Sequence, residues 1–247
     1  MVNKSFIKLS FFSFNMFAWI IRHGEIFLKG RNRGMFEKKL VNNIRDCLAK
    51  NKIVFNGLKR MRNRMLFYSD DDCACLKNVF GIASFSKAFE IRQDMEEMKK
   101  TALMLYVDKA SRIAENEMKN RGKSFRISAQ RLEKDFKHNS EEINRIVGAY
   151  VVKKKMAKVS LEKPDINIGI ELFDKKAYAF NEKTNGRGGL PVGVEGNIGL
   201  LLEDENSLLA GILMLKRGCS ITLVKKSAKG IDYGMLKEYC YGFELIS

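Results

Sequence analysis

The sequence predicts a mixed α/β (α+β) protein made of three pieces that follow one another along the chain. Three observations support this prediction. Strand and helix patterns alternate over residues 16–91, two longer helices with further strands occupy residues 92–184, and a strand–turn–helix pattern lies within residues 198–217. Hydrophobic residues make up 45% of the 247 residues, which supports packed cores and excludes a disordered chain.

The first piece, residues 16–91, begins with a predicted strand over residues 17–22. From Gly34 onward, apolar side chains recur on one helical face, which predicts a helix. The remaining elements are two short strands, a short helix and a last strand, predicted over residues 53–55, 65–68, 72–79 and 83–91. This β-α-β-β-α-β order is typical of a small ferredoxin-like domain.

The second piece, residues 92–184, contains two predicted helices. Asn139 is the expected N-cap of the second one, because Glu142, three residues further on, completes a capping box. The elements in chain order are a helix, a strand, a polar loop, the capped helix and two strands, predicted over residues 94–120, 124–129, 130–137, 140–155, 166–173 and 177–182.

A glycine-rich connector, residues 185–197, leads into the third piece, residues 198–247. The connector is either a flexible linker or a functional loop, since glycine-rich segments serve both purposes. The third piece has predicted strands, helices and a final strand over residues 198–202, 207–217, 220–224, 235–239 and 243–246.

The turn before the helix of the third piece has the layout of a phosphate site, because free N–H groups at a helix start attract anions. Such a turn normally needs glycines, which let a phosphate approach the backbone. This chain has instead a sequence of acidic and polar residues: Glu203, Asp204, Glu205, Asn206 and Ser207. We therefore expect these residues to form a degenerate nucleotide loop that repels phosphate.

The formal charge of +16 points to nucleic acid or another anionic surface as a partner. Residues 1–69 carry 15 Lys and Arg residues against three acids, so most of the excess lies in the first quarter of the chain. A lysine-rich proteome is the alternative explanation, but it would spread the charge more evenly. We favour a local anion-binding surface.

No metal site and no catalytic residue is predicted. The five cysteines form no CxxC pair, and Cys73 and Cys75 lack a second pair or a nearby His to complete four metal ligands. The two histidines, His23 and His138, have no nucleophile pattern near them. Buried or half-exposed thiols in a reducing cytosol, and hence a cytoplasmic protein, are the expectation.

The first 15 residues are predicted to be an extension before the folded domain, either genuine or the result of an upstream start site. Their apolar stretch lacks a small-residue cleavage site, and it is shorter than the roughly 20 apolar residues of a membrane span. No membrane association is expected.

Three stretches resemble one family, the tRNA 4-thiouridine synthases (tRNA sulfurtransferases). Residues 24–44 (GEIFLKGRNRGMFEKKLVNNI) are similar to the start of the family's ferredoxin-like domain, and residues 124–151 resemble the centre of a THUMP domain. Residues 186–202 (GRGGLPVGVEGNIGLLL) are similar to the connector into the family's PP-loop ATPase domain. The resemblance therefore implies three domains: ferredoxin-like over 16–91, THUMP over 92–184 and a Rossmann-like PP-loop remnant over 198–247.

The third of these domains departs from the family. The family's PP-loop reads S-G-G-x-D-S, whose backbone amides hold ATP pyrophosphate, and only Ser207 matches it by type. The family's domain also continues further and carries an active-site cysteine in its later part. Neither Cys219 nor Cys240 lies in a matching motif. The resemblance therefore implies a degenerate, truncated PP-loop, and no ATP or other cofactor is expected unless the ATP site is merely divergent.

The matching domains are those that the resemblance associates with binding the acceptor end of tRNA. Basic residues in and near them are the predicted contacts, because phosphate contacts position an RNA. The predicted nucleic-acid-binding residues are Lys29, Arg31, Arg33, Arg60, Arg62, Arg64, Arg126, Arg131, Lys134, Lys137, Arg145, Lys153, Lys154 and Arg187.

The leading hypothesis is a non-catalytic tRNA-binding protein of this family. A separate catalytic PP-loop subunit is a candidate partner, and a homodimer is compatible with the sequence. The first alternative is an active or split tRNA sulfurtransferase with a divergent ATP site. The second is a generic RNA-binding protein or RNA chaperone.

Overall fold

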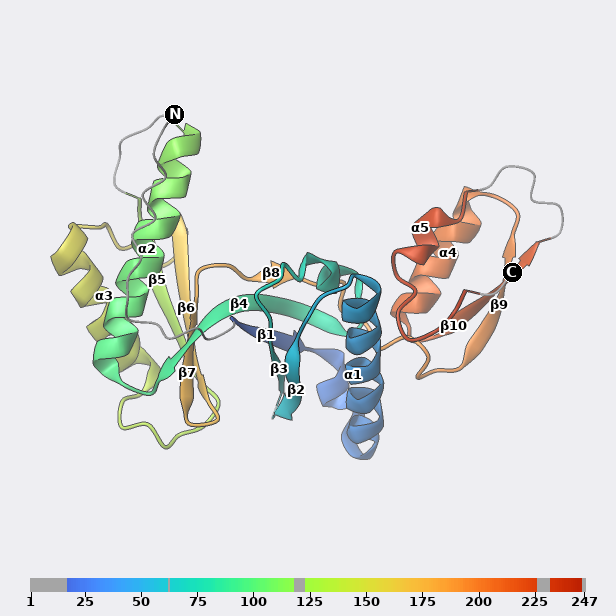
Figure 1. Cartoon of the computed structure of the whole chain (residues 1–247), viewed down its shortest axis with the longest axis horizontal. Coiled ribbons are helices and arrows are strands. Elements are labelled where there is room, and N and C mark those ends of the chain that lie inside the picture. The colour runs from blue at the N-terminus through green and yellow to red at the C-terminus, as the bar shows by residue number, and fades with distance from the viewer. Residues whose placement is uncertain (1–16, 62, 118–122, 226–231, 246–247) are drawn as a thin grey trace.

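The computed structural model describes residues 17–61, 63–117, 123–225 and 232–245, and these form three units in a row (Figure 1). The predicted extension 1–15 and Arg62 lie outside the described residues. One sheet runs through the first two units in the order β2-β3-β1-β4-β7-β6-β5, with β8 pairing to β4. The mixed α/β class predicted from the sequence is confirmed.

The strands of the first domain lie in the order β2-β3-β1-β4 within the sheet, and the domain is ferredoxin-like as predicted. Its elements are β1 (Ala18–His23), η1 (Glu25–Asn32), α1 (Arg33–Lys50), β2 (Asn56–Met61), β3 (Arg64–Tyr68), η2 (Ala74–Asn78) and β4 (Ile82–Arg92). The short second helix is a 3-10 helix. The predicted strand at 53–55 is wrong, because that segment closes the end of α1: the Ile53 N–H donates to Leu48 O, and the Val54 N–H donates to the Asp71 carboxylate.

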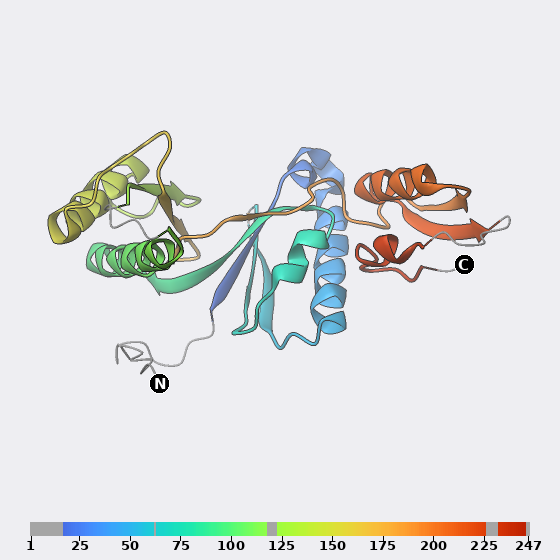
Figure 2. The same cartoon turned by 90° about the horizontal axis from the view of Figure 1, so that it is seen from above.

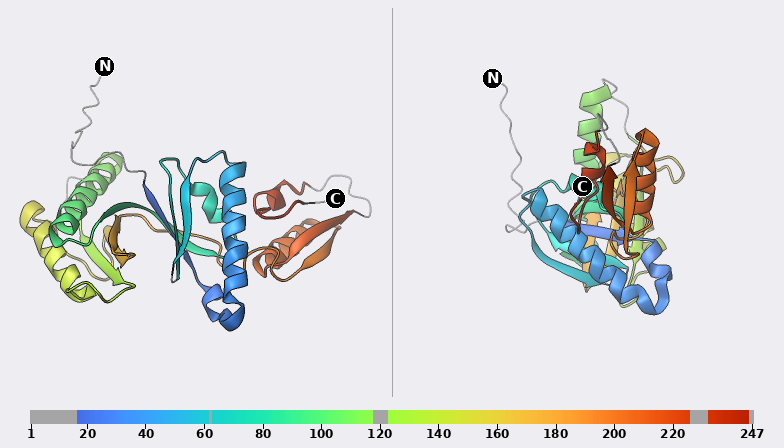
Figure 3. Two further views of the ribbon diagram at one scale, coloured as in Figure 1. Left: turned by 60° about the horizontal axis from the view of Figure 1, so that its bottom comes forward. Right: turned by 90° about the vertical axis from the view of Figure 1, so that its right-hand side faces the viewer.

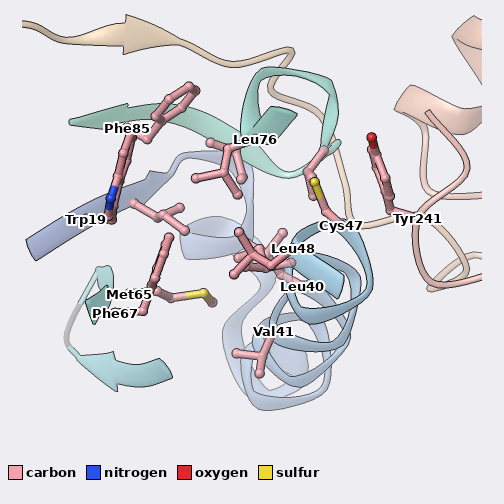
Figure 4. Close-up of a cluster of buried hydrophobic side chains, with 14 of the residues drawn as sticks. Trp19, Leu40, Val41, Cys47, Leu48, Met65, Phe67, Leu76, Phe85 and Tyr241 are labelled. Carbon is pink, nitrogen blue, oxygen red and sulfur yellow. The ribbon is translucent and has the colours of Figure 1, made fainter. Parts of the chain in front are cut away.

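The core of the first domain lies between its sheet and α1 (Figure 4). The apolar face predicted for the helix is buried: Phe36, Leu40, Ile44 and Leu48 are at most 4% exposed. On the sheet, the Trp19 ring stacks on Phe67, with a centroid separation of 6.2 Å. The Trp19 indole N–H donates to Ser69 O at 3.1 Å.

The second domain consists of α2 (Met95–Glu117), β5 (Phe125–Arg131), α3 (Ser140–Lys155), β6 (Ile166–Phe173), β7 (Lys176–Phe180) and the short β8 (Thr184–Asn185). Helices α2 and α3 cover one face of its strands and bury a second core there. The capping box at the start of α3 is confirmed, since Asn139 and Glu142 bond to each other's backbone N–H. The last residues predicted for the first helix, 118–120, lie outside the described part.

The two domains share β4. Its first part pairs with β1 through Ala88, and its last residues, Phe89–Arg92, pair with β7. The β6–β7 hairpin also packs against the open face of the first domain's sheet, where Phe173, Tyr178 and Phe180 lie with Ile20 and Leu66 in one buried cluster. The two domains are therefore joined by β4, which runs from one into the other in Figure 2, and by an apolar contact.

The connector between the second domain and the C-terminal unit is hydrogen-bonded along its length. Gly188 N–H donates to Ile82 O at 2.8 Å, and Leu190 N–H donates to Lys216 O at 2.9 Å. Gly189 has a φ of +74°, and a Cβ there would lie 2.3 Å from Lys216 O. Of the two interpretations left open by the sequence, a flexible linker does not fit a segment held in this way.

The C-terminal unit contains β9 (Asn197–Leu202), α4 (Glu205–Lys216), β10 (Ser220–Lys225) and the short α5 (Gly234–Lys237). The predicted strand–turn–helix–strand layout is correct, and β9 and β10 pair in parallel. The predicted strand at 243–246 is wrong for its described residues, 243–245, which form no strand. The unit lies beside α1 (Figure 3), where Lys50 donates to Cys240 O at 2.9 Å, and Asn43 of the same helix donates to Val192 O of the connector at 3.1 Å.

Candidate nucleic-acid interface

Four segments from both domains meet along one edge of the molecule, the lower edge in Figure 1. They are η1 with the start of α1, the β2–β3 turn, the β6–β7 turn and the loop between β5 and α3. We call this the basic edge and define it by seven described basic residues. These are Arg31, Arg33, Lys59, Arg60, Arg131, Lys134 and Lys137. Six of them belong to the set predicted from the sequence.

A cleft of about 800 Å³ marks the point where the two domains meet on the basic edge. Its lining comes from α1, from β2 and from the β6–β7 turn: Arg33, Glu37, Lys59, Arg60, Met61 and Asp174. Three cations line the cleft, and one of them, Arg33, is already paired, because its Nε lies 2.7 Å from Glu37 Oε1. Lys59 and Arg60 are exposed, and they give the cleft its positive charge.

The loop between β5 and α3 is fixed by its own contacts. Arg131 is half-buried, and its Nη1 donates to Phe136 O at 2.8 Å, which draws the loop into a compact turn. Lys134 and Lys137 are exposed on this loop. The structure thus gives Arg131 a supporting part in the loop and presents the two lysines to solvent.

Arg64 departs from the expectation of a surface contact. Its residue is 8% exposed, and its Nε donates to Glu171 Oε2 at 2.8 Å. The other Glu171 oxygen accepts from Arg22 Nε at 2.7 Å. Because two arginines enclose this carboxylate inside the domain junction, we exclude Arg64 from the candidate interface.

His23 lies close to this junction and is 7% exposed. Burial lowers the pKa of His23, against the opposing effect of Glu37, whose Oε1 is 3.7 Å from His23 Nε2. Neither ring nitrogen hydrogen bonds to a described residue. A neutral, enclosed imidazole with no such partner is an unsuitable general acid or base.

A second group of predicted residues lies on α3, away from the basic edge. Arg145, Lys153 and Tyr150 line a groove between α2 and α3, and the Lys154 ammonium lies 5.8 Å from the centre of the Tyr150 ring. On the other side of α3, a mainly apolar groove of about 570 Å³ reaches β5, again with Arg145 and Lys153 at its rim. These residues give α3 a basic surface of its own.

Two further predicted residues are engaged in local contacts. Arg126 on β5 donates to Asn167 Oδ1 at 3.2 Å and to Leu161 O at 2.8 Å. Arg187 in the connector donates to the Tyr239 hydroxyl at 3.0 Å. The backbone of Lys29 lies in η1, and its side chain is outside the described part.

The structure also points to a basic residue that the sequence reasoning missed. Lys175 is exposed at the tip of the β6–β7 turn, on the basic edge, where Asp174 and Lys175 have φ values of 52° and 55°. These left-handed values fit the two-residue turn of a tight hairpin. The Asp-Lys-Lys run between two predicted strands was the available signal, but only the pairing of the domains places it on this edge.

The predicted degenerate nucleotide loop forms the start of α4. Asp204 is its N-cap, and its Oδ1 accepts from the Ser207 N–H at 2.9 Å. The hydrogen bond from the Ser207 backbone lowers the pKa of Asp204, with further bonds from the Asn206 and Ser207 side chains. The protein's own carboxylate therefore occupies the helix start that a phosphate would use in a working loop. Glu203 and Glu205 are exposed beside it.

Three further features were considered in the described part of the chain: a metal site, a reactive cysteine and a membrane-spanning helix. No three His, Cys, Asp or Glu side chains come together there as a metal site. Burial raises the pKa of Cys240 to about 11, so its sulfur is a thiol at neutral pH. None of the helices described combines the length and the apolar character that crossing a membrane requires.

Comparison with known proteins agrees with this architecture. Residues 18–86 match the family model of the ThiI ferredoxin-like domain, and residues 92–180 match that of the THUMP domain. The molecule is thus a two-domain THUMP protein with a C-terminal α/β unit. The chain belongs to the tRNA sulfurtransferase (4-thiouridine synthase) family.

Named relatives are similar over most of this chain. A probable tRNA sulfurtransferase of Thermococcus kodakarensis is 35% identical over 235 residues, which cover 90% of this chain and 60% of the relative. One of Geobacillus kaustophilus is 36% identical over 213 residues, covering 83% of this chain and 50% of the relative. The chain therefore spans between half and three-fifths of these curated relatives.

Two solved structures are also similar. The crystal structure of PH1313 from Pyrococcus horikoshii has a TM-score of 0.85 at 35% identity and covers 94% of this chain and 78% of its own. A 4-thiouridine synthetase in complex with RNA and bound ATP has a TM-score of 0.72 at 31% identity, covering 93% of this chain and 60% of its own.

Proposed function

We propose that this chain binds tRNA near the acceptor end, and that the basic edge is the contact surface. The observation that carries the proposal is that exposed cations of both domains lie along one edge. Lys59 and Arg60 of β2 line the cleft at the domain junction, and Lys134 and Lys137 lie on the second domain's loop between β5 and α3. Cations spaced along such an edge suit the regular phosphates of an RNA backbone. The RNA complex of a similar 4-thiouridine synthetase supports the choice of ligand.

The first expected result is salt-sensitive binding that depends on the tRNA end. With six to eight phosphate contacts, affinity for tRNA falls about 10³- to 10⁴-fold between 50 and 200 mM salt. Intact tRNA should displace a labelled tRNA at lower concentration than either tRNA trimmed of its 3′ end or duplex DNA of equal length. Fluorescence anisotropy at several salt concentrations measures both effects. Equal competition by all three ligands would instead favour a general RNA-binding protein or chaperone.

We further propose that the chain itself lacks ATP-dependent adenylation and sulfur transfer. Support comes from α4, whose first N–H groups are capped by Asp204 with carboxylates at Glu203 and Glu205 beside it. In this proposal a separate PP-loop subunit supplies the chemistry, the protein acts in the cytoplasm without a cofactor, and a second copy of the chain is an optional partner. The rival function, an active or split sulfurtransferase, is favoured by the intact parallel β9–α4–β10 layout.

Magnesium-ATP separates these two functions. A ligand that binds the native state raises the melting temperature by mass action. We expect no change in melting temperature at millimolar ATP, because carboxylates occupy the phosphate position. A dose-dependent rise would establish an ATP site and revive the sulfurtransferase. The control ligand is tRNA at low salt, which should raise the melting temperature in the same assay.

A further inference from the structure

A buried charged cluster crosses the junction between the first and second domains. Its carboxylate, Glu171 on β6, is 4% exposed and accepts from two first-domain arginines, Arg22 on β1 at 2.7 Å and Arg64 on β3 at 2.8 Å. Arg64 Nη2 donates in addition to Gln130 Oε1 at 3.0 Å, and Gln130 belongs to β5 of the second domain. The cluster therefore links strands that lie 107 residues apart along the chain.

A gain in folding stability is a weak explanation for this buried cluster of charges. Removing charges from water is costly, and buried ion groups are often no more stabilising than apolar residues of the same volume. Arg22 Nη2 also makes no hydrogen bond to a described residue. A carboxylate does offer defined geometry, because each oxygen accepts from a different arginine along a preferred direction.

The cluster lies directly behind the basic edge. Arg64 begins β3 and pairs with Met61 at the end of β2, next to Arg60. On the second domain, Gln130 precedes Arg131, which holds the loop that carries Lys134 and Lys137. Glu171 itself lies three residues before Asp174, which lines the cleft. The cluster around Glu171 is therefore in contact with the segments that carry the cations of both domains.

We propose that Glu171 is a positioning residue for RNA recognition. It fixes the angle between the two domains, so that the first-domain cations and the second-domain cations contact the same RNA strand. The inference rests on the proposed function and adds the residue that sets the geometry of the interface.

The substitution Glu171→Gln distinguishes a charge effect from a positioning role, because the two predict opposite changes in RNA affinity. If Glu171 acts only through its charge, removal of one negative charge tightens binding of a polyanion. If it positions the domains, binding of a tRNA acceptor-stem minihelix weakens about tenfold, and the slope of log affinity against log salt decreases by about 2, because one half of the edge loses its phosphate contacts. We expect weaker binding with a smaller slope.

Glu133→Gln is the matched control. Glu133 is exposed on the loop beside Lys134, so the same chemical change removes a charge without touching the domain junction. Its affinity should equal or exceed that of the wild-type chain, with an unchanged slope. Small-angle scattering of both variants tests the domain angle without RNA, and a changed profile is expected only for Glu171→Gln.

A second variant covers the case in which Glu171→Gln does not fold. Gln130→Met removes the outermost acceptor of the cluster, keeps the side-chain length and leaves the buried carboxylate in place. It should weaken minihelix binding about twofold to threefold and lower the salt slope. Wild-type affinity and slope in the folded variants would overturn the positioning role. Failure of the wild-type chain to bind the minihelix would instead remove the proposed function.

Discussion

Exchanging four cations of the basic edge for glutamine should weaken tRNA binding about 10²- to 10³-fold, if each phosphate contact contributes about 1 kcal/mol. The slope of log affinity against log salt should decrease by about 4, roughly one for each cation removed. The four residues are Arg31, Arg60, Lys134 and Lys137, all exposed in the structure. Filter binding or anisotropy at a series of salt concentrations measures both quantities.

The matched control removes the same amount of charge elsewhere. Lys77, Lys158, Lys163 and Lys183 are exposed and lie outside the basic edge. Exchanging these four for glutamine lowers the net charge equally, so any loss of affinity there measures general attraction alone. Equal losses in the two quadruple variants would show that tRNA contacts the protein without using the basic edge.

Trp19→Ala should lower the free energy of unfolding by about 3–5 kcal/mol, because a large buried ring leaves a cavity that the core only partly fills. Trp19 is 4% exposed, stacks on Phe67 and lies 6.1 Å from the Phe85 ring centre. Circular dichroism during urea unfolding is the suitable measurement, since Trp19 is the single tryptophan of the chain.

Met156→Ala is the comparison for this stability change. Met156 is 93% exposed at the end of α3, so its truncation should change the free energy of unfolding by less than about 0.5 kcal/mol. A loss below about 1 kcal/mol for Trp19→Ala would contradict the packing described for the first domain.

Local patterns predicted much of the fold. The apolar periodicity from Phe36 to Leu48 identified the buried face of α1, and the Asn139–Glu142 pair identified the start of α3. Both signals act within a few residues, so they can be recognised without the tertiary structure. The strand predicted at 53–55 failed for the opposite reason. Its apolar side chains suggested a strand, but Val54 is 71% exposed, and the backbone of this segment is bonded to Leu48 and Asp71.

The candidate site was less accessible to sequence reasoning. Arg60 and Arg64 lie in one basic run, and nothing local separates them. One is exposed and the other is buried only because Glu171, from a distant strand, reaches it. Lys175 was overlooked for a related reason, since its turn joins the basic edge only when the β6–β7 hairpin packs on the first domain.

For the acidic turn before α4, the sequence predicted the charge of the turn but not its hydrogen bonds. The sequence predicted carboxylates that disfavour phosphate, and the structure adds that Asp204 bonds the helix start directly. The capping box between Asp204 and Ser207 has a serine at the third helical position, so the usual Glu or Gln signal was missing.

The shared strand β4 has a consequence for how the chain folds. The family models divide the sequence between residues 86 and 92, inside this strand. The strand β4 pairs first with β1 and then with β7. If either pairing is lost, β4 loses hydrogen bonds that hold it in position for the other. We therefore expect the two matched domains to unfold together, because the sheet of the second domain uses the last residues of a first-domain strand.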